Sequence, residues 1–297
     1  MSDEQVTAEL QQMTAELRTI GVIGAGTMGT GIAHDLVLHG LSAVVVDVSD
    51  AVLERARNEI VRLVRFGSLV KATVPKVPVS AALERLRFTT NLADVAGCDF
   101  IIENVPEVFE IKSAVYTELD AICRPDVCFG VNTSCISITR IAAVTRRPQQ
   151  VVGMHFMNPV YLKEAVEVIR GFHTTDATLT RASALLSVLS KSAIVVNDMP
   201  GFVANRISHL MMNEAAFLVQ DQVADPAAID EIFKRCYGHV MGPLETADLI
   251  GLDTVVQSID VLYESYQDPK FRCSPLLRKM VAAGKLGRKS GEGFYKY

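Results

Sequence analysis

The chain lacks the cysteine and histidine spacings that hold metal ions. Its six cysteines contain no CxxC pair and lie mostly in apolar segments, and its six histidines show no metal-ligand spacing. We therefore expect small buried thiols in a reducing compartment, with no disulfide framework, no zinc site and no other metal.

Long apolar runs and an excess of positive charge are missing as well. One of the longest runs, residues 42–46, is far shorter than the roughly 20 residues of a membrane span. Residues 1–17 carry three glutamates and no apolar stretch, which is unlike a secretory or mitochondrial signal. The 29 basic and 34 acidic residues give a formal charge of −5, which argues against nucleic acid or an anionic membrane as the main partner. We expect a cytoplasmic protein that binds neither nucleic acid nor a membrane.

The residues that are present suit a large globular core. Hydrophobic residues make up 49% of the 297 positions, enough for two domains. In the first part, short β-branched runs alternate with helical spacing, which indicates a doubly wound, mainly parallel sheet. The expected strands are 19–24, 43–47, 99–103, 127–132, 151–155, 165–169 and 193–196.

The character of the sequence changes at Pro200-Gly201, after which amphipathic helices replace strands. Asp225-Pro226, Gly242-Pro243 and Ser274-Pro275 are typical of helix starts, since proline fits the first turn of a helix. We predict an N-terminal extension over 1–17, an α/β domain over 18–199 and an all-helical C-terminal domain over 200–297.

A glycine-rich turn follows the first expected strand, in the form Gly24-Ala-Gly26-Thr-Met-Gly29. Gly24 permits the tight turn, Gly26 lets the backbone approach a pyrophosphate, and Gly29 lets the next helix lie close to the strand. This GxGxxG motif is weak alone, but the second strand ends at Asp47, 18 residues after Gly29, where an acid binds a ribose 2′-hydroxyl. The pattern predicts a Rossmann-type domain. NAD is favoured over NADP, because the Asp47 carboxylate repels a 2′-phosphate.

His155 ends one expected strand, and Glu167 lies in the next one, 12 residues later. A neutral imidazole suits proton abstraction from an alcohol near neutral pH, and a neighbouring carboxylate stabilises the resulting imidazolium. An isolated histidine would instead be read as a core residue. Ser134 follows a strand end and either binds the substrate hydroxyl or caps a helix over 136–143.

Six motifs resemble the L-3-hydroxyacyl-CoA dehydrogenase family, in unbroken order from about Thr19 to the C-terminus. They are Asn132-Thr133-Ser134, Gly153–Pro159, Glu167–Ile169, Pro200–Arg206, Gly242–Asp248 and Leu286–Tyr295.

The resemblance implies NAD-dependent oxidation of a short 3-hydroxyacyl thioester and a homodimer formed through the C-terminal domain. It makes His155 and Glu167 the catalytic pair, and it places Ser134 and Asn205 near the reacting oxygens. The implied cofactor contacts are Gly24, Gly26, Thr27, Met28, Gly29, Asp47, Glu107, Lys112 and Asn132, and Asn158 is an implied substrate contact beside Ser134. Without the resemblance, Glu107 and Lys112 are also consistent with solvated charges at a helix start, and Asn158 with a residue that shapes a turn.

One stretch departs from this family, which there presents lysines to the phosphates of coenzyme A. Phe66 and Ser68 stand among Arg62, Arg65 and Lys71, the remaining candidate contacts to the substrate handle. Because each lost cation removes charge-assisted contacts, the phosphorylated end of coenzyme A is expected to contribute less. A thioester on an acyl carrier protein lacks that end.

A second resemblance supports this alternative. Four segments are similar to polyketide-pathway dehydrogenases that oxidise glyceryl on an acyl carrier protein: Glu103-Asn-Val, Asn132–Thr139, Met157–Lys163 and Phe217–Val223. The alternative substrate is therefore carrier-bound, and we expect it to be turned over more efficiently than its coenzyme A counterpart.

Two other classes of protein stay open at this point. One is a non-catalytic dinucleotide-binding or structural protein, against which Ser134, His155, Glu167 and Asn205 argue together. The other is a 2-hydroxyacid or sugar-acid dehydrogenase with a lysine base, which the spacing of His155 and Glu167 disfavours.

Overall fold

The computed structural model describes residues 14–70 and 74–297. The chain divides into two compact units, the first ending at Asp198 and the second covering Met199–Tyr297. Of the predicted N-terminal extension, residues 1–13 lie outside the described residues, as does Lys71.

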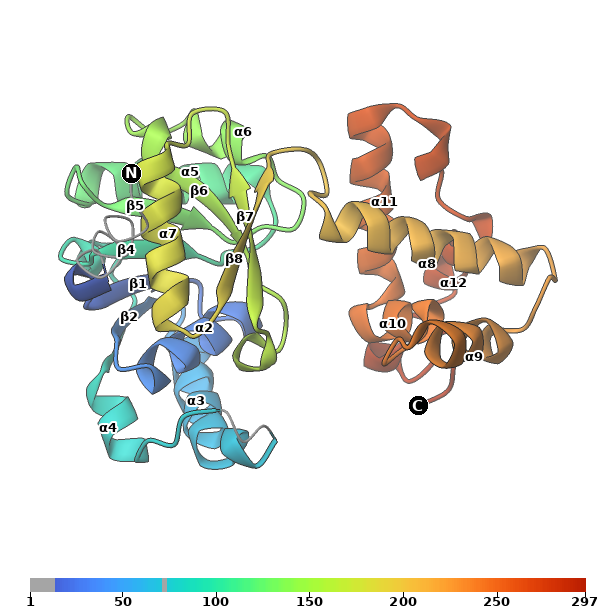
Figure 1. The fold of residues 1–297 in the computed structure, drawn as a ribbon, viewed down its shortest axis with the longest axis horizontal. Helices are drawn as coiled ribbons and strands as arrows, with labels where there is room; N and C mark the ends of the chain where they lie inside the picture. Colours follow the sequence, from blue (N-terminus) through green and yellow to red (C-terminus); the bar gives the residue numbers. More distant parts are fainter. Residues whose placement is uncertain (1–13, 71–73) are drawn as a thin grey trace, which may run out of the picture. The chain divides into compact units, whose positions relative to one another are not determined.

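Eight strands form one sheet in the first unit, in the order β3-β2-β1-β4-β5-β6-β7-β8 (Figure 1). The strands are β1 (Thr19–Ile23), β2 (Ser42–Val46), β3 (Leu86–Thr89), β4 (Phe100–Glu103), β5 (Cys128–Val131), β6 (Val151–His155), β7 (Ala165–Arg170) and β8 (Ser192–Asn197). Neighbouring strands pair in parallel except β6 and β7, which are antiparallel. The predicted doubly wound, mainly parallel sheet and its seven expected strands are confirmed. Strand β3 was not expected, because its sequence Leu-Arg-Phe-Thr contains a single β-branched residue and a charged one.

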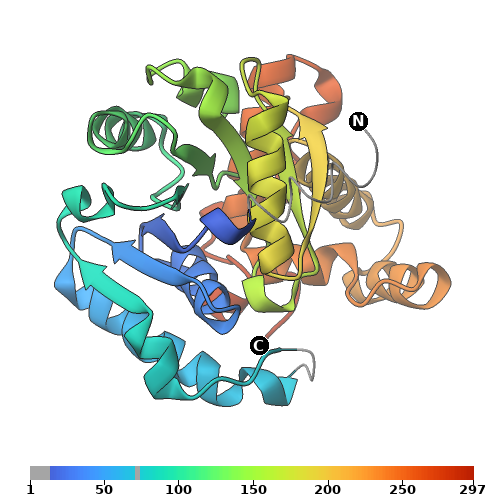
Figure 2. The same cartoon turned by 60° about the vertical axis from the view of Figure 1, so that its left-hand side comes forward.

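Helices cover both faces of this sheet, so its central strands are buried on both sides and read as continuous apolar runs. On one face lie α2 (Thr27–Leu38), α3 (Asp50–Val70) and α7 (Asp176–Val188). Figure 2 shows α7 lying along β7 and β8. The other face carries α5 (Phe109–Ile122) and α6 (Ile138–Ala142), and there the Tyr116 ring of α5 packs on Phe129 of β5. The short helix α4 (Val79–Glu84) precedes β3.

The second unit is helical, as predicted from the sequence. Its helices are α8 (Ala204–Gln220), α9 (Pro226–Tyr237), α10 (Pro243–Ile250), α11 (Leu252–Tyr266) and α12 (Pro275–Ala282). The three predicted helix starts are confirmed. Asp225 caps α9 by accepting the Ala228 N–H at 2.8 Å, and Pro226 stands at the first helical position.

Asp248 of α10 connects this helix to the C-terminal residues. It is fully buried and accepts the backbone N–H groups of Phe294 and Tyr295, each at 3.0 Å. Gly293 stands where a Cβ would come within 2.0 Å of the Asp248 carboxylate. The two most C-terminal motifs of the sequence are therefore joined to each other by a structural contact.

No helix in the described part of the chain is long and apolar enough to span a membrane.

Candidate active site

The glycine turn between β1 and α2 has the geometry of a dinucleotide cradle. Gly24 has φ +87°, and a Cβ on it would lie 2.7 Å from the Asn104 carbonyl oxygen. A Cβ on Gly29 would lie 1.8 Å from the Gly24 carbonyl oxygen, so only glycine lets α2 approach the strand. At Gly26, the N-cap of α2, nothing lies within 4 Å of an added Cβ, and no side chain caps the helix. The open space and the uncapped helix N-terminus fit the pyrophosphate of NAD.

Asp47 lies just after β2, beside this turn. Its Oδ2 accepts the Ala25 N–H at 2.8 Å, so the carboxylate is held against the glycine turn. In that position the remaining lone pairs of the carboxylate can accept a hydrogen bond from a ribose 2′-hydroxyl. The same negative charge repels a phosphate on that ribose oxygen.

His155 and Glu167 meet because β6 and β7 are antiparallel and pair these two residues directly. The distance from His155 Nδ1 to Glu167 Oε2 is 2.9 Å, and the two residues are 5% and 9% exposed. On the other side of the ring, His155 Nε2 lies 3.4 Å from Ser134 Oγ. The imidazole therefore has a carboxylate at one nitrogen and a hydroxyl at the other, which is the arrangement of an oriented general base.

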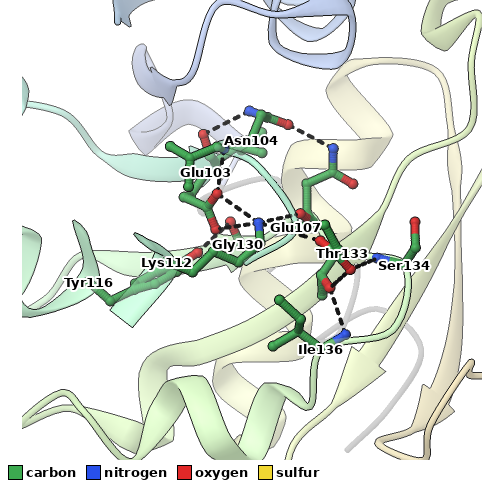
Figure 3. Close-up of polar contacts among 12 residues, drawn as sticks. Glu103, Asn104, Glu107, Lys112, Tyr116, Gly130, Thr133, Ser134 and Ile136 are labelled. Atoms are coloured by element: carbon green, nitrogen blue, oxygen red, sulfur yellow. Dashed lines mark hydrogen bonds and ion pairs between the residues drawn. The ribbon is translucent and has the colours of Figure 1, made fainter. Parts of the chain in front are cut away.

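The loop that carries Ser134 is held by Glu107 (Figure 3). Glu107 Oε1 accepts from Thr133 Oγ1 at 2.5 Å, from the Ser134 N–H at 2.8 Å and from the Cys135 N–H at 3.0 Å. The alternative role of Ser134 as a helix cap is wrong. The cap of α6 is Ser137, whose side chain accepts the Arg140 N–H, because the helix begins at Ile138 and not at residue 136.

Lys112 lies inside the protein and is shielded from solvent. It is 0% exposed, and its Nζ donates to Glu103 Oε1 at 2.8 Å, to Glu103 Oε2 at 3.0 Å and to the Asn132 carbonyl at 2.9 Å. Burial raises the pKa of Glu103 above its ordinary value, and the Lys112 ammonium opposes that rise. A direct contact of Lys112 with the cofactor stays a prediction from the resemblance.

Asn132 joins three strand ends. Its side-chain amide donates to Asn104 Oδ1 at 2.7 Å, and its Oδ1 accepts the Phe156 N–H at 3.2 Å. The residue that follows His155 is thereby fixed to the loop that carries Ser134.

A cavity of about 580 Å³ opens beside the glycine turn, between α2, α3 and the loop after His155. Gly26, Thr27 and Asn158 line it together with Arg55 and Arg62 of α3. Arg62 is exposed and forms a bidentate pair with Glu59, at 2.7 and 2.6 Å. The structure thus places Arg62 and Asn158 at one cavity.

The other predicted substrate residues have different positions. Arg65 is exposed on α3 outside the lining of this cavity. Asn205 belongs to the second unit, in the first turn of α8, where its carbonyl accepts from His209 Nδ1 at 3.0 Å.

Three residues near the site were given no site role in the sequence analysis. Glu103 is the buried counter-charge of Lys112, while Arg55 and Tyr161 line the cavity. A glutamate at the end of a strand as buried as β4 was the available signal for Glu103, because an acid in such a place needs a partner.

The sequence matches two family descriptions. "3-hydroxyacyl-CoA dehydrogenase, NAD binding domain" covers residues 19–199, and "3-hydroxyacyl-CoA dehydrogenase, C-terminal domain" covers residues 201–297.

Similar proteins and structures agree with these matches. A probable 3-hydroxybutyryl-CoA dehydrogenase of Deinococcus radiodurans is 47% identical over 93% of this chain and 99% of its own length. The 3-hydroxybutyryl-CoA dehydrogenase of Bradyrhizobium diazoefficiens is 44% identical over 96% of this chain and 97% of its own. The crystal structure of (S)-3-hydroxybutyryl-CoA dehydrogenase from Ralstonia eutropha superposes with a TM-score of 0.88 at 42% identity, covering 95% of this chain and 99% of that one. The chain is an NAD-dependent oxidoreductase that acts on CH–OH groups, and it belongs to the 3-hydroxyacyl-CoA dehydrogenase family.

Proposed function

We propose that the protein oxidises the C3 hydroxyl of a short 3-hydroxyacyl-CoA, with 3-hydroxybutyryl-CoA as the substrate to test first. The observation that carries this proposal is the Ser134–His155–Glu167 arrangement, in which His155 ends β6 and Glu167 faces it from β7. The names of the similar proteins support a four-carbon acyl group on coenzyme A.

The geometry supports a role for each side chain. His155 Nε2 takes the hydroxyl proton, and Glu167 at Nδ1 stabilises the imidazolium that forms. Ser134 Oγ, 3.4 Å from the same Nε2, hydrogen-bonds the substrate oxygen and holds it against the base. NAD, when bound, supplies the acceptor for the hydride that leaves C3. Asn205 remains a proposed substrate contact from the second unit.

The handle of the thioester is proposed to be coenzyme A, whose phosphates Arg55 and Arg62 would meet in the cavity beside the glycine turn. Phe66 and Ser68 of α3 led to the expectation that an acyl carrier protein is the preferred handle of the thioester. The names of the similar proteins reported above instead specify coenzyme A thioesters as substrates. Lys71 lies outside the described residues, so its part in the handle stays a prediction.

The test compares one acyl group on three handles. The rate of NADH formation is measured with 3-hydroxybutyryl-CoA, with its pantetheine thioester and with the same group on an acyl carrier protein. We expect the highest kcat/KM with coenzyme A. A clearly higher kcat/KM on the carrier protein would overturn coenzyme A as the handle, and no turnover of any of the three would overturn the proposed reaction.

Variants of α3 sharpen this comparison. Arg62→Gln should lower kcat/KM for the coenzyme A thioester about 3–10-fold, a modest loss because the side chain is exposed. The same variant should leave kcat/KM for the pantetheine thioester unchanged, because that thioester lacks the phosphates that Arg62 would contact. Glu59→Gln should raise kcat/KM for coenzyme A, because it frees the Arg62 guanidinium from its bidentate partner. Arg57→Gln is the matched control, since Arg57 is exposed on the same helix outside the cavity.

We also propose a homodimer formed through the second unit. Apolar side chains on its surface support this, among them Ile207 of α8 at 63% exposed and Ile232 of α9 at 51%. Sedimentation equilibrium of the wild type and of Ile207→Asp is the test. A monomeric wild type would overturn the proposal.

A further inference from the structure

A buried lysine just before β8 has no part in the site described above. Lys191 is 7% exposed, yet its ammonium group has three oxygen partners. Nζ donates to the carbonyls of Val160 and Lys163, at 2.8 and 2.7 Å, at the two ends of a short 3₁₀ helix, η3 (Val160–Leu162). It also lies 3.0 Å from Asp35 Oδ2 of α2, which is 2% exposed. Three partners match the three hydrogens of an ammonium group and compensate for its lost hydration.

The partners of Lys191 belong to two elements that pack against each other. The two carbonyls belong to η3, while Asp35 lies in α2. One turn before Asp35, on the same face of α2, an added Cβ on Gly31 would lie 3.1 Å from Val160 Cγ2, so η3 touches the helix there. Lys191 therefore fastens η3 to the face of α2 that carries Gly31 and Asp35.

Both elements are also walls of the cavity proposed for the phosphates of coenzyme A. Thr30 and Gly31 of α2 line this cavity of about 580 Å³, and so do Val160 and Tyr161 of η3. The Tyr161 ring stands edge-on to His34 of α2, with ring centroids 5.4 Å apart. Any change in the separation of η3 and α2 therefore changes the shape of the cavity and moves the Tyr161 ring.

His155 is anchored separately from η3. Pairing with Glu167 of β7 fixes His155 in the sheet, and the next residue, Phe156, donates its N–H to Asn132 Oδ1 at 3.2 Å. Three residues of loop separate Phe156 from η3. A displaced η3 should therefore alter binding in the cavity more than the chemistry at His155.

We propose that Lys191, with Asp35 as its counter-charge, is a positioning residue that holds η3 against α2 and thereby sets the shape of the cavity for the coenzyme A handle. This inference rests on the proposed function, in which the phosphates of coenzyme A occupy that cavity. It assigns part of the affinity for the handle to a lysine outside the lining of the cavity.

The test removes Lys191 without leaving a buried negative charge. Lys191→Met alone would leave the Asp35 carboxylate without its counter-charge, and the domain could unfold for that reason. Asp35→Asn is therefore the reference, in which Lys191 still donates to both carbonyls of η3, so KM for 3-hydroxybutyryl-CoA should stay within about threefold of the wild type. Adding Lys191→Met should raise that KM about 5–20-fold, with kcat changed by less than about threefold.

A second double variant guards against a failure to fold. Asp35→Leu with Lys191→Met replaces the buried ion pair by apolar side chains of similar size, an exchange that is often neutral or stabilising. Compared with the wild type, it should show the same rise in KM at nearly unchanged kcat.

Two comparisons separate this role from a general loss of stability. The pantetheine thioester lacks the phosphates, so its KM should change by less than about twofold when Lys191→Met is added to Asp35→Asn. Asp120→Asn removes the counter-charge of another buried cation in the same unit, Arg147, whose Nε lies 2.6 Å from Asp120 Oδ1. This variant should lower Tm but leave KM for 3-hydroxybutyryl-CoA unchanged.

A third comparison asks whether Lys191 acts through η3. Tyr161→Ala removes the ring that η3 places at the cavity. In that background, adding Lys191→Met to Asp35→Asn should raise KM for 3-hydroxybutyryl-CoA much less than it does when Tyr161 is present, because the two residues act on one interaction.

Several results would overturn the proposal. An unchanged KM for 3-hydroxybutyryl-CoA in both double variants is the most direct of them. An equal rise in KM for the pantetheine thioester, equal effects with and without Tyr161, or a similar rise in Asp120→Asn would each show a merely structural role of Lys191.

One further readout does not depend on turnover. The NMR signals of the Tyr161 ring, assigned with Tyr161→Phe, should move when Lys191→Met is added to Asp35→Asn and stay unchanged in Asp120→Asn. Unmoved signals in the double variant would contradict the positioning role. If the wild type turns over neither thioester, the proposed function fails, while this NMR comparison still decides whether Lys191 holds η3 in place.

Discussion

His34 of α2 is buried in a place that suits only its neutral form. The side chain is 0% exposed, its ring lies edge-on to Tyr161 with centroids 5.4 Å apart, and neither ring nitrogen has a hydrogen-bond partner among the described residues. Burial lowers the pKa of His34 from 6.5 to about 4, with a smaller contribution from His39, while Glu59 opposes the change. Protonation of this ring should therefore destabilise the folded first unit.

The sign and size of the effect follow from the two pKa values. Above pH 6.5 the ring is neutral in both the folded and the unfolded chain, so His34 has no effect on stability there. Between pH 6.5 and about 4 only the unfolded chain binds the proton, and the free energy of unfolding falls as the pH falls. The loss is about 2 kcal/mol at pH 5 and about 3 kcal/mol in total, at roughly 1.4 kcal/mol per pH unit.

Urea unfolding at pH 7 and pH 5 measures this loss. Other groups titrate over the same interval, so the informative quantity is the difference between the wild type and His34→Phe, which keeps a ring and removes the titration. We expect the drop in unfolding free energy between the two pH values to be about 2 kcal/mol smaller in His34→Phe. His173→Gln is the control, since His173 is exposed, and its drop should equal that of the wild type. Equal drops in His34→Phe and the wild type would refute the reasoning.

Three predictions concern the proposed active site. Asp47→Ala should lower the ratio of kcat/KM for NAD over NADP by about tenfold or more, because it removes a carboxylate that repels the 2′-phosphate; an unchanged ratio would contradict the role of Asp47. His155→Ala should lower kcat about 10²–10⁴-fold at an unchanged dissociation constant for NADH. Wild-type turnover in that folded variant would exclude His155 as the base. Glu167→Gln should lower kcat about 10–100-fold in steady-state assays with little change in melting temperature, since the amide keeps the contact at 2.9 Å but not the charge. If kcat stays at the wild-type value, Glu167 only orders the strand.

Local features of this protein were predictable from the sequence because local sterics and periodicity decide them. The glycine turn is an example: Gly24 adopts a positive φ, and Gly29 is required by its close approach to the Gly24 carbonyl oxygen, so both demands arise within the βα unit itself. The helix starts at Asp225-Pro226 and Ser274-Pro275 are another, since capping and the fixed φ of proline act within one turn. The expected strands carry short β-branched or apolar runs that a sequence pattern detects, while β3, Leu-Arg-Phe-Thr, contains a single β-branched residue and was not found.

Only the tertiary structure decided what the charged residues of the site contact. The spacing of His155 and Glu167 suggested adjacent strands, but their 2.9 Å contact depends on the antiparallel register of β6 and β7, the one such pair among the described strands. Lys112 is the sharpest case, because a lysine at a helix start reads as solvated, and Glu103 gives no indication of its partner along the chain. The energy of a buried charge depends on which groups surround it in space, and the packing of α5 on the sheet brings those groups together.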